Sequence, residues 1–254
     1  MPTNSDRVFR KRRASGGRLV AFEGLDGSGK STQVNLLLKL LEQERVKHEH
    51  ISFPRTSEPG YGEAIGMFLR GEFGVAESAN PYLIAALFAG DRAGAKPILD
   101  DWLSKGRLVL VDRYFYSNLA FQSAKLSNSK ERQHFRAWIR RIEFEYHRIP
   151  DPDVTFFFDV PFDFVRANIR KRPKERRSYL NGLVDVHESD LALQERVALE
   201  YRSFGAKDHS FCTISCATAA GQMRSPQNVH QEILRMLRAH QVLLEPVGQL
   251  DCTN

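Results

Sequence analysis

The sequence predicts an α/β fold built on a mainly parallel β-sheet. Short β-branched or aromatic runs alternate with longer segments of helical periodicity. The short runs are apolar throughout, as expected for strands that are covered on both faces. The chain has 254 residues, of which 42% are hydrophobic and 27% charged, which is enough to bury a core. No apolar run approaches the roughly 18 residues of a membrane-spanning helix, so we expect a soluble protein.

Five apolar runs are the expected strands, at 19–23, 49–53, 108–112, 155–160 and 211–215. Helical periodicity predicts seven helices, at 30–44, 62–69, 81–104, 130–147, 162–171, 189–204 and 227–240. No internal repeat and no linker rich in Pro, Gly or Ser divides residues 18–240. We therefore expect one domain over that range.

The ends of the chain and its composition add weaker signals. Residues 1–17 are basic and poor in apolar side chains, and are expected to form a disordered tail, with an organelle transit peptide as the alternative. Residues 241–254 are expected to form a C-terminal tail.

The net charge of +6 suits anionic ligands, either nucleotides or nucleic acids. Cys212, Cys216 and Cys252 lack the spacing of a zinc site, and reduced thiols predict a cytoplasmic location.

The strongest single motif follows the first strand directly. It fits the pattern G-x-x-x-x-G-K-[ST] with a strand before it and a helix after it, and consists of Gly24, Leu25, Asp26, Gly27, Ser28, Gly29, Lys30, Ser31 and Thr32. The glycines let backbone N–H groups turn inward around a phosphate. Lys30 is expected to reach the β- and γ-phosphates, and Ser31 to supply a ligand to Mg²⁺. The alternative is a glycine-rich turn with a solvated lysine.

A phosphate loop alone does not define a reaction, since ATPases, GTPases and kinases share it. We find no Asn-Lys-x-Asp segment of a GTPase, and the third strand ends in Asp112-Arg113 rather than in the Asp-Glu of a motor. A strand's carboxyl end is where ligands bind in open α/β sheets. Asp112 could anchor the Mg²⁺ shell through water and Arg113 could bridge two phosphates, or the two could be a surface pair of little energetic weight.

A dense basic segment follows the fourth strand, with Arg166, Arg170, Lys171, Arg172, Lys174, Arg176 and Arg177 around Pro173. A solvated face and a nucleic-acid patch are two interpretations. In a phosphoryl-transfer enzyme the segment, at about 170–187, would be a lid that excludes water and supplies arginine to the developing charge.

Four motifs in order resemble those of the thymidylate kinases, and the resemblance covers about residues 18–205. They are FEGLDGSGKSTQ at 22–33, FPR at 53–55 with EPG at 58–60, LFAGDR at 87–92, and DRY at 112–114 followed by SN at 117–118 and AFQ at 120–122. The resemblance implies transfer of the γ-phosphoryl of ATP to dTMP with Mg²⁺. It also implies a three-layer P-loop kinase fold, with a five-stranded parallel sheet, helices on both faces and a mobile lid. A homodimer is implied, and neither a membrane nor a nucleic acid is expected as partner.

The resemblance also implies roles for individual residues. Arg55 would clamp the acceptor phosphate, which suits a guanidinium, and Pro54 is a candidate for a cis peptide bond. Phe88 would stack on thymine, unless it belongs to the core, and Arg92 would contact a carbonyl oxygen of the base. Asp26 would bind the 3′-hydroxyl or a Mg²⁺ water. The remaining acceptor-site residues are Phe53, Arg113, Ser117, Asn118, Phe121 and Gln122.

Three departures from the family pattern bear on mechanism. Ser57 stands where many relatives have arginine, so Arg55 serves alone. Phe121 stands where some relatives have tyrosine, so we expect discrimination against ribose to depend on packing. Gly27 stands where one branch has arginine, so the catalytic cation should come from the lid, with Arg170, Arg172, Arg176 and Arg177 as candidates.

Two other functions remain open from the residues. A deoxynucleoside kinase would need a general base near the end of the second strand, where Glu58 is the obvious carboxylate, but Arg55 beside it favours a phosphate acceptor. A nucleic-acid-associated ATPase could use the basic tail and lid as its contact surface.

Overall fold

The computed structural model describes residues 16–74, 79–171, 180, 185–205, 208 and 210–243, and of residues 170, 171, 188 and 189 the backbone alone. Most of the expected N- and C-terminal tails and most of the expected lid therefore lie outside the described residues. Within the described residues, no helix combines the length and the apolar character needed to cross a bilayer.

Five parallel strands form one sheet in the order β2-β3-β1-β4-β5. They are β1 (Arg18–Glu23), β2 (His48–Ser52), β3 (Leu108–Asp112), β4 (Val154–Asp159) and β5 (Phe211–Ser215). The prediction of five strands is confirmed, with boundaries that differ by at most one residue. Phe22 of β1 and Ser52 of β2 both pair with Asp112 of β3, so the carboxyl ends of these three strands meet at one edge.

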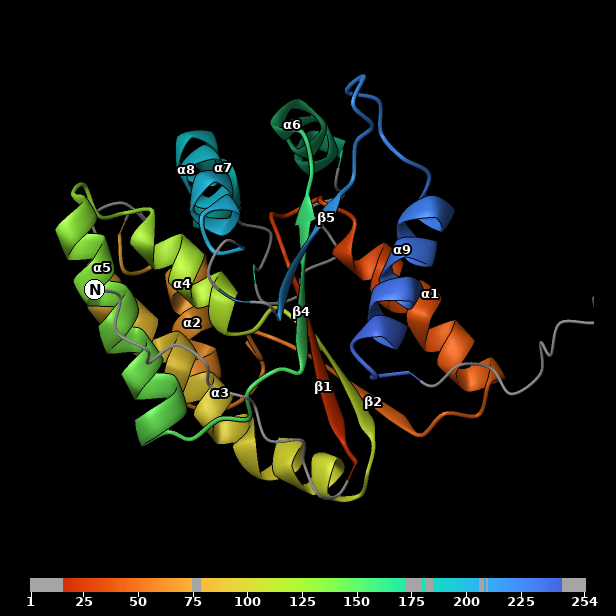
Figure 1. Ribbon diagram of the computed structural model, residues 1–254. Helices are drawn as coiled ribbons and strands as arrows, with labels where there is room; N and C mark the ends of the chain where they lie inside the picture. The colour runs from red at the N-terminus through yellow and green to blue at the C-terminus, as the bar shows by residue number, and fades with distance from the viewer. Residues whose placement is uncertain are drawn as a thin grey trace, which may run out of the picture.

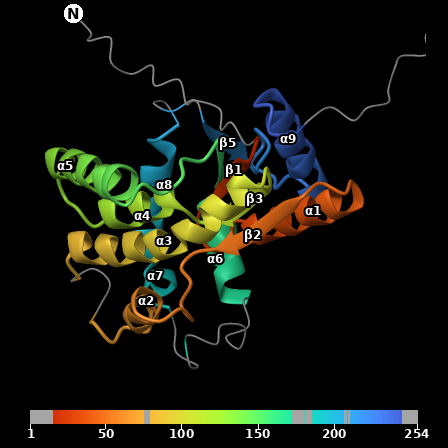
Figure 2. The same cartoon turned by 90° about the horizontal axis from the view of Figure 1, so that it is seen from below.

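Helices cover both faces of this sheet, which makes the predicted three layers (Figure 1). One face is covered by α1 (Lys30–Gln43) and α9 (Pro226–Ala239), and the other by α3 (Pro81–Ser104), α4 (Phe115–Ser123) and α8 (Leu191–Arg202), as Figure 2 shows from below. The remaining helices are α2 (Tyr61–Leu69), α5 (Ser129–Arg140), the π-helical η1 (Arg141–Tyr146), α6 (Phe162–Lys171) and α7 (Val186–Ser189).

The central strands are buried because both of their faces are covered. Residues 19–22 of β1 and 109–111 of β3 are fully inaccessible to solvent, and Phe22 packs against Phe156 and Phe158 of β4. Polar caps set where the covering helices begin. The Asn80 side chain accepts hydrogen bonds from the first turn of α3, and Ser225 caps α9 with Pro226 at its first position.

Three differences from the sequence prediction lie next to the cavity described below. The expected helix at 130–147 changes at Arg141 from α5 to the π-helical η1, which turns Glu143 into the interior. Helix α4 was missing from the prediction, because eight of its nine residues are buried and it therefore lacks a polar face. The expected helix at 189–204 is shorter, because Asp190 caps α8 and separates it from α7.

Candidate functional site

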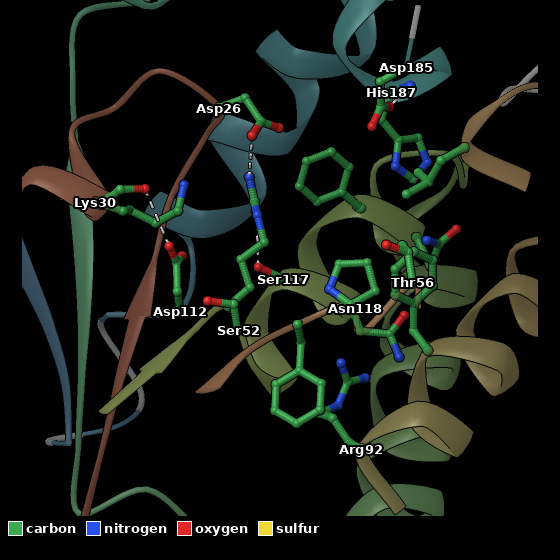
Figure 3. A pocket seen from close by; sticks show the side chains of 18 residues that line it. Asp26, Lys30, Ser52, Thr56, Arg92, Asp112, Ser117, Asn118, Asp185 and His187 are labelled. Atoms are coloured by element: carbon green, nitrogen blue, oxygen red, sulfur yellow. Dashed lines mark hydrogen bonds and ion pairs between the residues drawn. The ribbon is translucent and has the colours of Figure 1, made fainter. Parts of the chain in front are cut away.

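A cavity of about 320 Å³ opens at the carboxyl edge of the sheet (Figure 3). The loop between β1 and α1, the ends of β2 and β3, and helices α3 and α4 enclose it, together with Asp185 and His187. Most predicted site residues line this one space: Asp26, Lys30, Ser31, Phe53, Pro54, Phe88, Arg92, Asp112, Arg113, Ser117, Asn118, Phe121 and Gln122. The phosphate loop and the expected acceptor site are thus two ends of one cavity.

The phosphate loop places Lys30 inside the fold. Gly29 caps α1 with φ of +91°, a left-handed conformation that suits glycine. Lys30 is only 6% exposed, and its Nζ donates hydrogen bonds to the carbonyl oxygens of Gly24, at 3.0 Å, and Leu25, at 2.8 Å. From α6, the Asn168 side chain donates to the carbonyl oxygen of Gly27 at 2.9 Å. The interpretation of Lys30 as a solvated lysine is therefore wrong.

Arg113 follows β3 with a left-handed backbone, φ +64°, which residues other than glycine rarely adopt. Its guanidinium lies 3.0 Å from Asp26 Oδ1, donates to Ser117 Oγ at 3.1 Å, and lies 5.5 Å from the ring centroid of Phe121. Burial by itself lowers the pKa of Arg113, but neighbouring acidic groups, above all Asp26, outweigh burial and raise it. Arg113 is thus a fixed cation within the cavity rather than half of a solvated pair.

Two oxygen-bearing side chains that could act as metal ligands, Ser31 and Asp112, lie next to each other beside Lys30. The Ser31 hydroxyl donates to Asp112 Oδ2 at 3.5 Å, a long contact that Figure 3 marks with a dashed line. Strand pairing places Asp112 next to the end of β2, and the first turn of α1 places Ser31 opposite. A hydroxyl and a carboxylate are the ligand types that Mg²⁺ takes in phosphate sites.

A buried carboxylate behind Arg113 was missing from the predicted site. Glu23, fully buried at the end of β1, accepts hydrogen bonds from the backbone N–H groups of Tyr114, at 2.9 Å, and Ser117, at 3.1 Å. It also accepts from the hydroxyls of Ser117 and Tyr201. Burial, and then the charge of Glu23, raise the pKa of Tyr201 well above its usual value. The sequence did contain a signal that could have identified Glu23, because it is an acidic residue at the end of an apolar strand.

At the other end of the cavity, one carboxylate orients two predicted acceptor-site residues. Both oxygens of the fully buried Glu143 accept from the Arg92 guanidinium at 2.6 Å. Asn118 Nδ2 donates to Glu143 Oε1 and to the carbonyl oxygen of Ala85, both at 3.0 Å. Burial by itself lowers the pKa of Arg92. The charge of Glu143 and its hydrogen bonds to Arg92 outweigh this effect, so the pKa of Arg92 is raised. Phe88 is half-buried and lines the cavity, so it is not simply a core residue.

Arg55 lies beside the cavity but does not line it, unlike its neighbours Phe53, Pro54 and Thr56. The peptide bond before Pro54 is cis, as the family resemblance suggested. The Arg55 guanidinium donates to Asp91 Oδ1 at 2.9 Å and to the Asp91 carbonyl oxygen at 2.7 Å, and its backbone N–H donates to Asp91 Oδ2. Its role as a phosphate clamp stays a prediction, and Asp91 is the residue that would orient it.

The predicted lid contributes little to the described site. The side chain of Arg170, and Arg172, Arg176 and Arg177 entirely, lie outside the described residues. The end of the lid segment does reach the cavity, where Asp185 and His187 line the wall. Neither residue was singled out from the sequence, because a lone Asp and a lone His after a basic run carry no recognisable spacing.

The fold and the shared cavity define a P-loop phosphotransferase, since the phosphate loop opens directly onto a space for a second small molecule. A family model described as thymidylate kinase matches residues 22–233. The chain belongs to the thymidylate kinase family, and its activity is phosphoryl transfer from ATP to dTMP. Family membership favours neither the deoxynucleoside kinase nor the nucleic-acid-associated ATPase.

Similar proteins agree with this assignment. The thymidylate kinase of Mycobacterium tuberculosis (strain ATCC 25618 / H37Rv) is 32% identical over 189 residues, which cover 74% of this chain and 86% of that relative. The thymidylate kinase of Plasmodium falciparum (isolate 3D7) is 30% identical over 193 residues, covering 76% and 80%. A solved thymidylate kinase from Candida albicans superposes with a TM-score of 0.65 at 23% identity, covering 89% of this chain and 92% of the other, and supports the fold.

Proposed function

We propose that phosphoryl transfer takes place within the cavity at the carboxyl edge of the sheet, with the phosphates of ATP at Lys30 and the base of dTMP at Phe88 and Arg92. The observation that supports this arrangement is that one continuous lining joins the phosphate loop to the Phe88 and Arg92 wall. A nucleotide monophosphate bound along it presents its phosphate toward Lys30. The two reacting groups are then held close together in one space, and such positioning is a major source of rate in phosphoryl transfer.

The chain's residues act in this mechanism by position and charge. Lys30 and the N–H groups at the start of α1 bind the donor phosphates. Arg113 lies at the junction of the two ends, where its guanidinium can bridge donor and acceptor phosphates as charge shifts between them. The phosphate of dTMP is already ionised at neutral pH, so the reaction needs no general base. Glu58 is exposed, 4.0 Å from Arg55, and does not line the cavity.

The oxygen donors of Ser31 and Asp112 fit Mg²⁺, with Ser31 as a direct ligand and Asp112 acting through water. Asp26 is the third candidate, although its carboxylate is paired with Arg113. When bound with ATP, the ion would neutralise charge on the transferring phosphate.

ADP release with Mg-ATP and a panel of acceptors tests the proposal. The panel contains thymidine, the common deoxynucleoside monophosphates, dUMP and the ribonucleoside monophosphates. We expect dTMP to give the highest kcat/KM. A preference for thymidine itself would overturn the proposed phosphate acceptor, and ADP release that is independent of acceptor would indicate an ATPase.

We also propose a homodimer formed through an apolar hollow between α3 and η1. Exposed apolar side chains surround it, including Leu83, Tyr61, Phe73 and Tyr146. Such a patch is typical of a subunit interface. Light scattering after size exclusion should give twice the chain mass for the wild type and a monomer for Leu83→Glu, and a monomeric wild type would overturn this.

The buried free thiols of Cys212 and Cys216 fit the reducing cytoplasm, where we place the protein.

A further inference from the structure

Two residues outside the predicted site, His187 and Lys125, lie together on the wall of the cavity. His187 of α7 is 6% exposed and lines the cavity, on the side away from Lys30 in Figure 3. Its ring lies 4.9 Å from that of Phe121 at an angle of 32°, and 5.1 Å from that of Phe68. Lys125, just after α4, places its Nζ 3.3 Å from His187 Nε2 and 5.1 Å from the Phe68 ring centroid.

We propose that His187 is an acceptor-binding residue, and that Lys125 positions the imidazole so that its Nδ1–H donates a hydrogen bond to the 3′-hydroxyl of dTMP. This inference rests on the proposed function, because it assigns a contact within the same acceptor site. It adds a polar contact to a region where the sequence had suggested packing alone, opposite Phe121.

The contact with Lys125 determines which ring nitrogen carries the proton. A lysine ammonium has hydrogen-bond donors and no acceptor, so Nε2 of His187 must accept from it. Burial, and then the charge of Lys125, lower the pKa of His187 well below its usual value, so the ring is neutral at pH 7. In a neutral imidazole whose Nε2 accepts, Nδ1 carries the hydrogen. Among the described residues, no hydrogen bond uses Nδ1, which leaves this donor for a molecule in the cavity.

The position of His187 along the cavity identifies the group it meets. The Phe121 ring lies 4.9 Å from the His187 ring and 5.5 Å from the Arg113 guanidinium, and Arg113 is paired with Asp26 of the phosphate loop at 3.0 Å. His187 therefore lines the cavity near the junction between the phosphate loop and Phe121. A nucleotide with its phosphate toward Lys30 and its base at Arg92 places its sugar at this junction. A hydroxyl can donate to a carboxylate and accept from an N–H at the same time. The 3′-hydroxyl can therefore bond both Asp26 and His187.

The charged and titratable groups around the pair come from several elements. Asp190, the N-cap of α8, raises the pKa of Lys125, while burial lowers it more strongly, to about 8. Around His187, Asp26 raises its pKa and Arg113 lowers it, and Asp185 accepts a hydrogen bond from its backbone N–H. Lys125 is thus protonated below about pH 8 and neutral above it. A neutral amine can accept a hydrogen bond, so above this pH the His187 ring can carry its hydrogen on Nε2 instead of Nδ1.

The first test deletes each partner of the proposed hydrogen bond in turn. KM is measured for dTMP and for its 3′-deoxy analogue with the wild type and with His187→Phe, which keeps an aromatic ring against Phe121. One hydrogen bond corresponds to about a tenfold change in affinity. We expect His187→Phe to raise KM for dTMP roughly tenfold and to change KM for the 3′-deoxy analogue and for ATP by less than about twofold. His134→Phe, exposed on α5, is the matched control.

Two results would overturn the contact. Equal increases in KM for both acceptors would mean that the ring acts by packing, and no increase for either would mean that it does not meet the sugar. Calorimetric binding of dTMP in the absence of ATP separates this inference from the proposed function. If the wild type binds dTMP and His187→Phe loses no more affinity for it than for the 3′-deoxy analogue, the contact alone fails. If the wild type does not bind dTMP, both proposals fail.

The second test concerns the positioning role of Lys125. In the wild type, KM for dTMP should rise several-fold between pH 7 and pH 9, as Lys125 loses its proton, while KM for the 3′-deoxy analogue stays level. Lys125→Met should show the higher KM at every pH, and Lys125→Arg, which keeps the charge, should restore the low value across the range. A wild-type profile without this rise, or one that Lys125→Met retains, would overturn the role of Lys125.

Discussion

The two ends of the cavity hold their cations in different ways. At the base end, Arg92 is 2% exposed and both of its bonded nitrogens go to one fully buried carboxylate, Glu143. At the phosphate end, Arg113 divides its contacts between Asp26 and Ser117, and Lys30 bonds backbone carbonyls of its own loop. The bidentate ion pair between Arg92 and Glu143 is rigid. Lys30, in contrast, can exchange its hydrogen bonds to carbonyl oxygens for hydrogen bonds to a phosphate.

This difference matches what each end must do. A base is recognised by donors that stay in place, so a buried, bidentate pair suits Arg92. A transferring phosphate changes its charge distribution, so cations with several alternative partners suit Lys30 and Arg113. Substitutions at the phosphate end should therefore lower kcat, and substitutions at the base end should affect stability or acceptor KM.

The largest effect should come from Lys30→Ala at the phosphate end. We expect kcat to fall by roughly 10³-fold, because the charge that stabilises the transferring phosphate is lost. Thermal unfolding should stay close to that of the wild type. Lys39→Ala, on an exposed position of the same helix, is the control and should change neither quantity. A near-normal rate in Lys30→Ala would contradict the assigned role of the phosphate loop.

At the base end, Glu143→Gln should mainly affect stability. It leaves the buried Arg92 charge without its counter-ion, which costs about 3 kcal/mol. For a domain of this size, thermal unfolding should shift down by roughly 6–12 °C. Glu145→Gln, two residues away and exposed, should leave the unfolding temperature unchanged. Equal unfolding temperatures for the two variants would show that Glu143 does not hold Arg92.

Arg113→Lys tests whether the phosphate end requires a guanidinium or only a charge. A lysine ammonium can pair with Asp26 but cannot contact Asp26, Ser117 and a phosphate in one plane. We expect kcat to fall about 30-fold with a smaller change in KM for dTMP. Arg107→Lys, near the start of β3 and outside the cavity, serves as the control. An unchanged kcat would mean that the charge alone suffices.

The smallest effect should come from Phe88→Ala. Losing a stacking partner for thymine should raise KM for dTMP about tenfold, or about 1.4 kcal/mol, and leave KM for ATP unchanged. Ile98→Ala, exposed on the same helix α3, should change neither constant. If KM for dTMP does not move in Phe88→Ala, then Phe88 serves the core rather than the acceptor.

Local sequence was sufficient for the strands and for the phosphate end. Apolar runs specify buried parallel strands, and the spacing of the glycines and Lys30 specifies a loop whose backbone surrounds phosphate. Both are recognised from the pattern of residues that are neighbours in the sequence. Helix α4 was not predicted, because burial on nearly all sides removes the periodicity that identifies a helix.

The sequence by itself determined the class of fold, the phosphate loop and the family, because these are written in patterns of neighbouring residues. Only the tertiary structure decided what holds the site in place. Glu143 lies 51 residues from Arg92, Asp91 lies 36 from Arg55, and His187 lies 62 from Lys125. A buried charge needs a partner, but its identity depends on which side chains the packed helices bring within hydrogen-bond reach, and no local pattern encodes that distance.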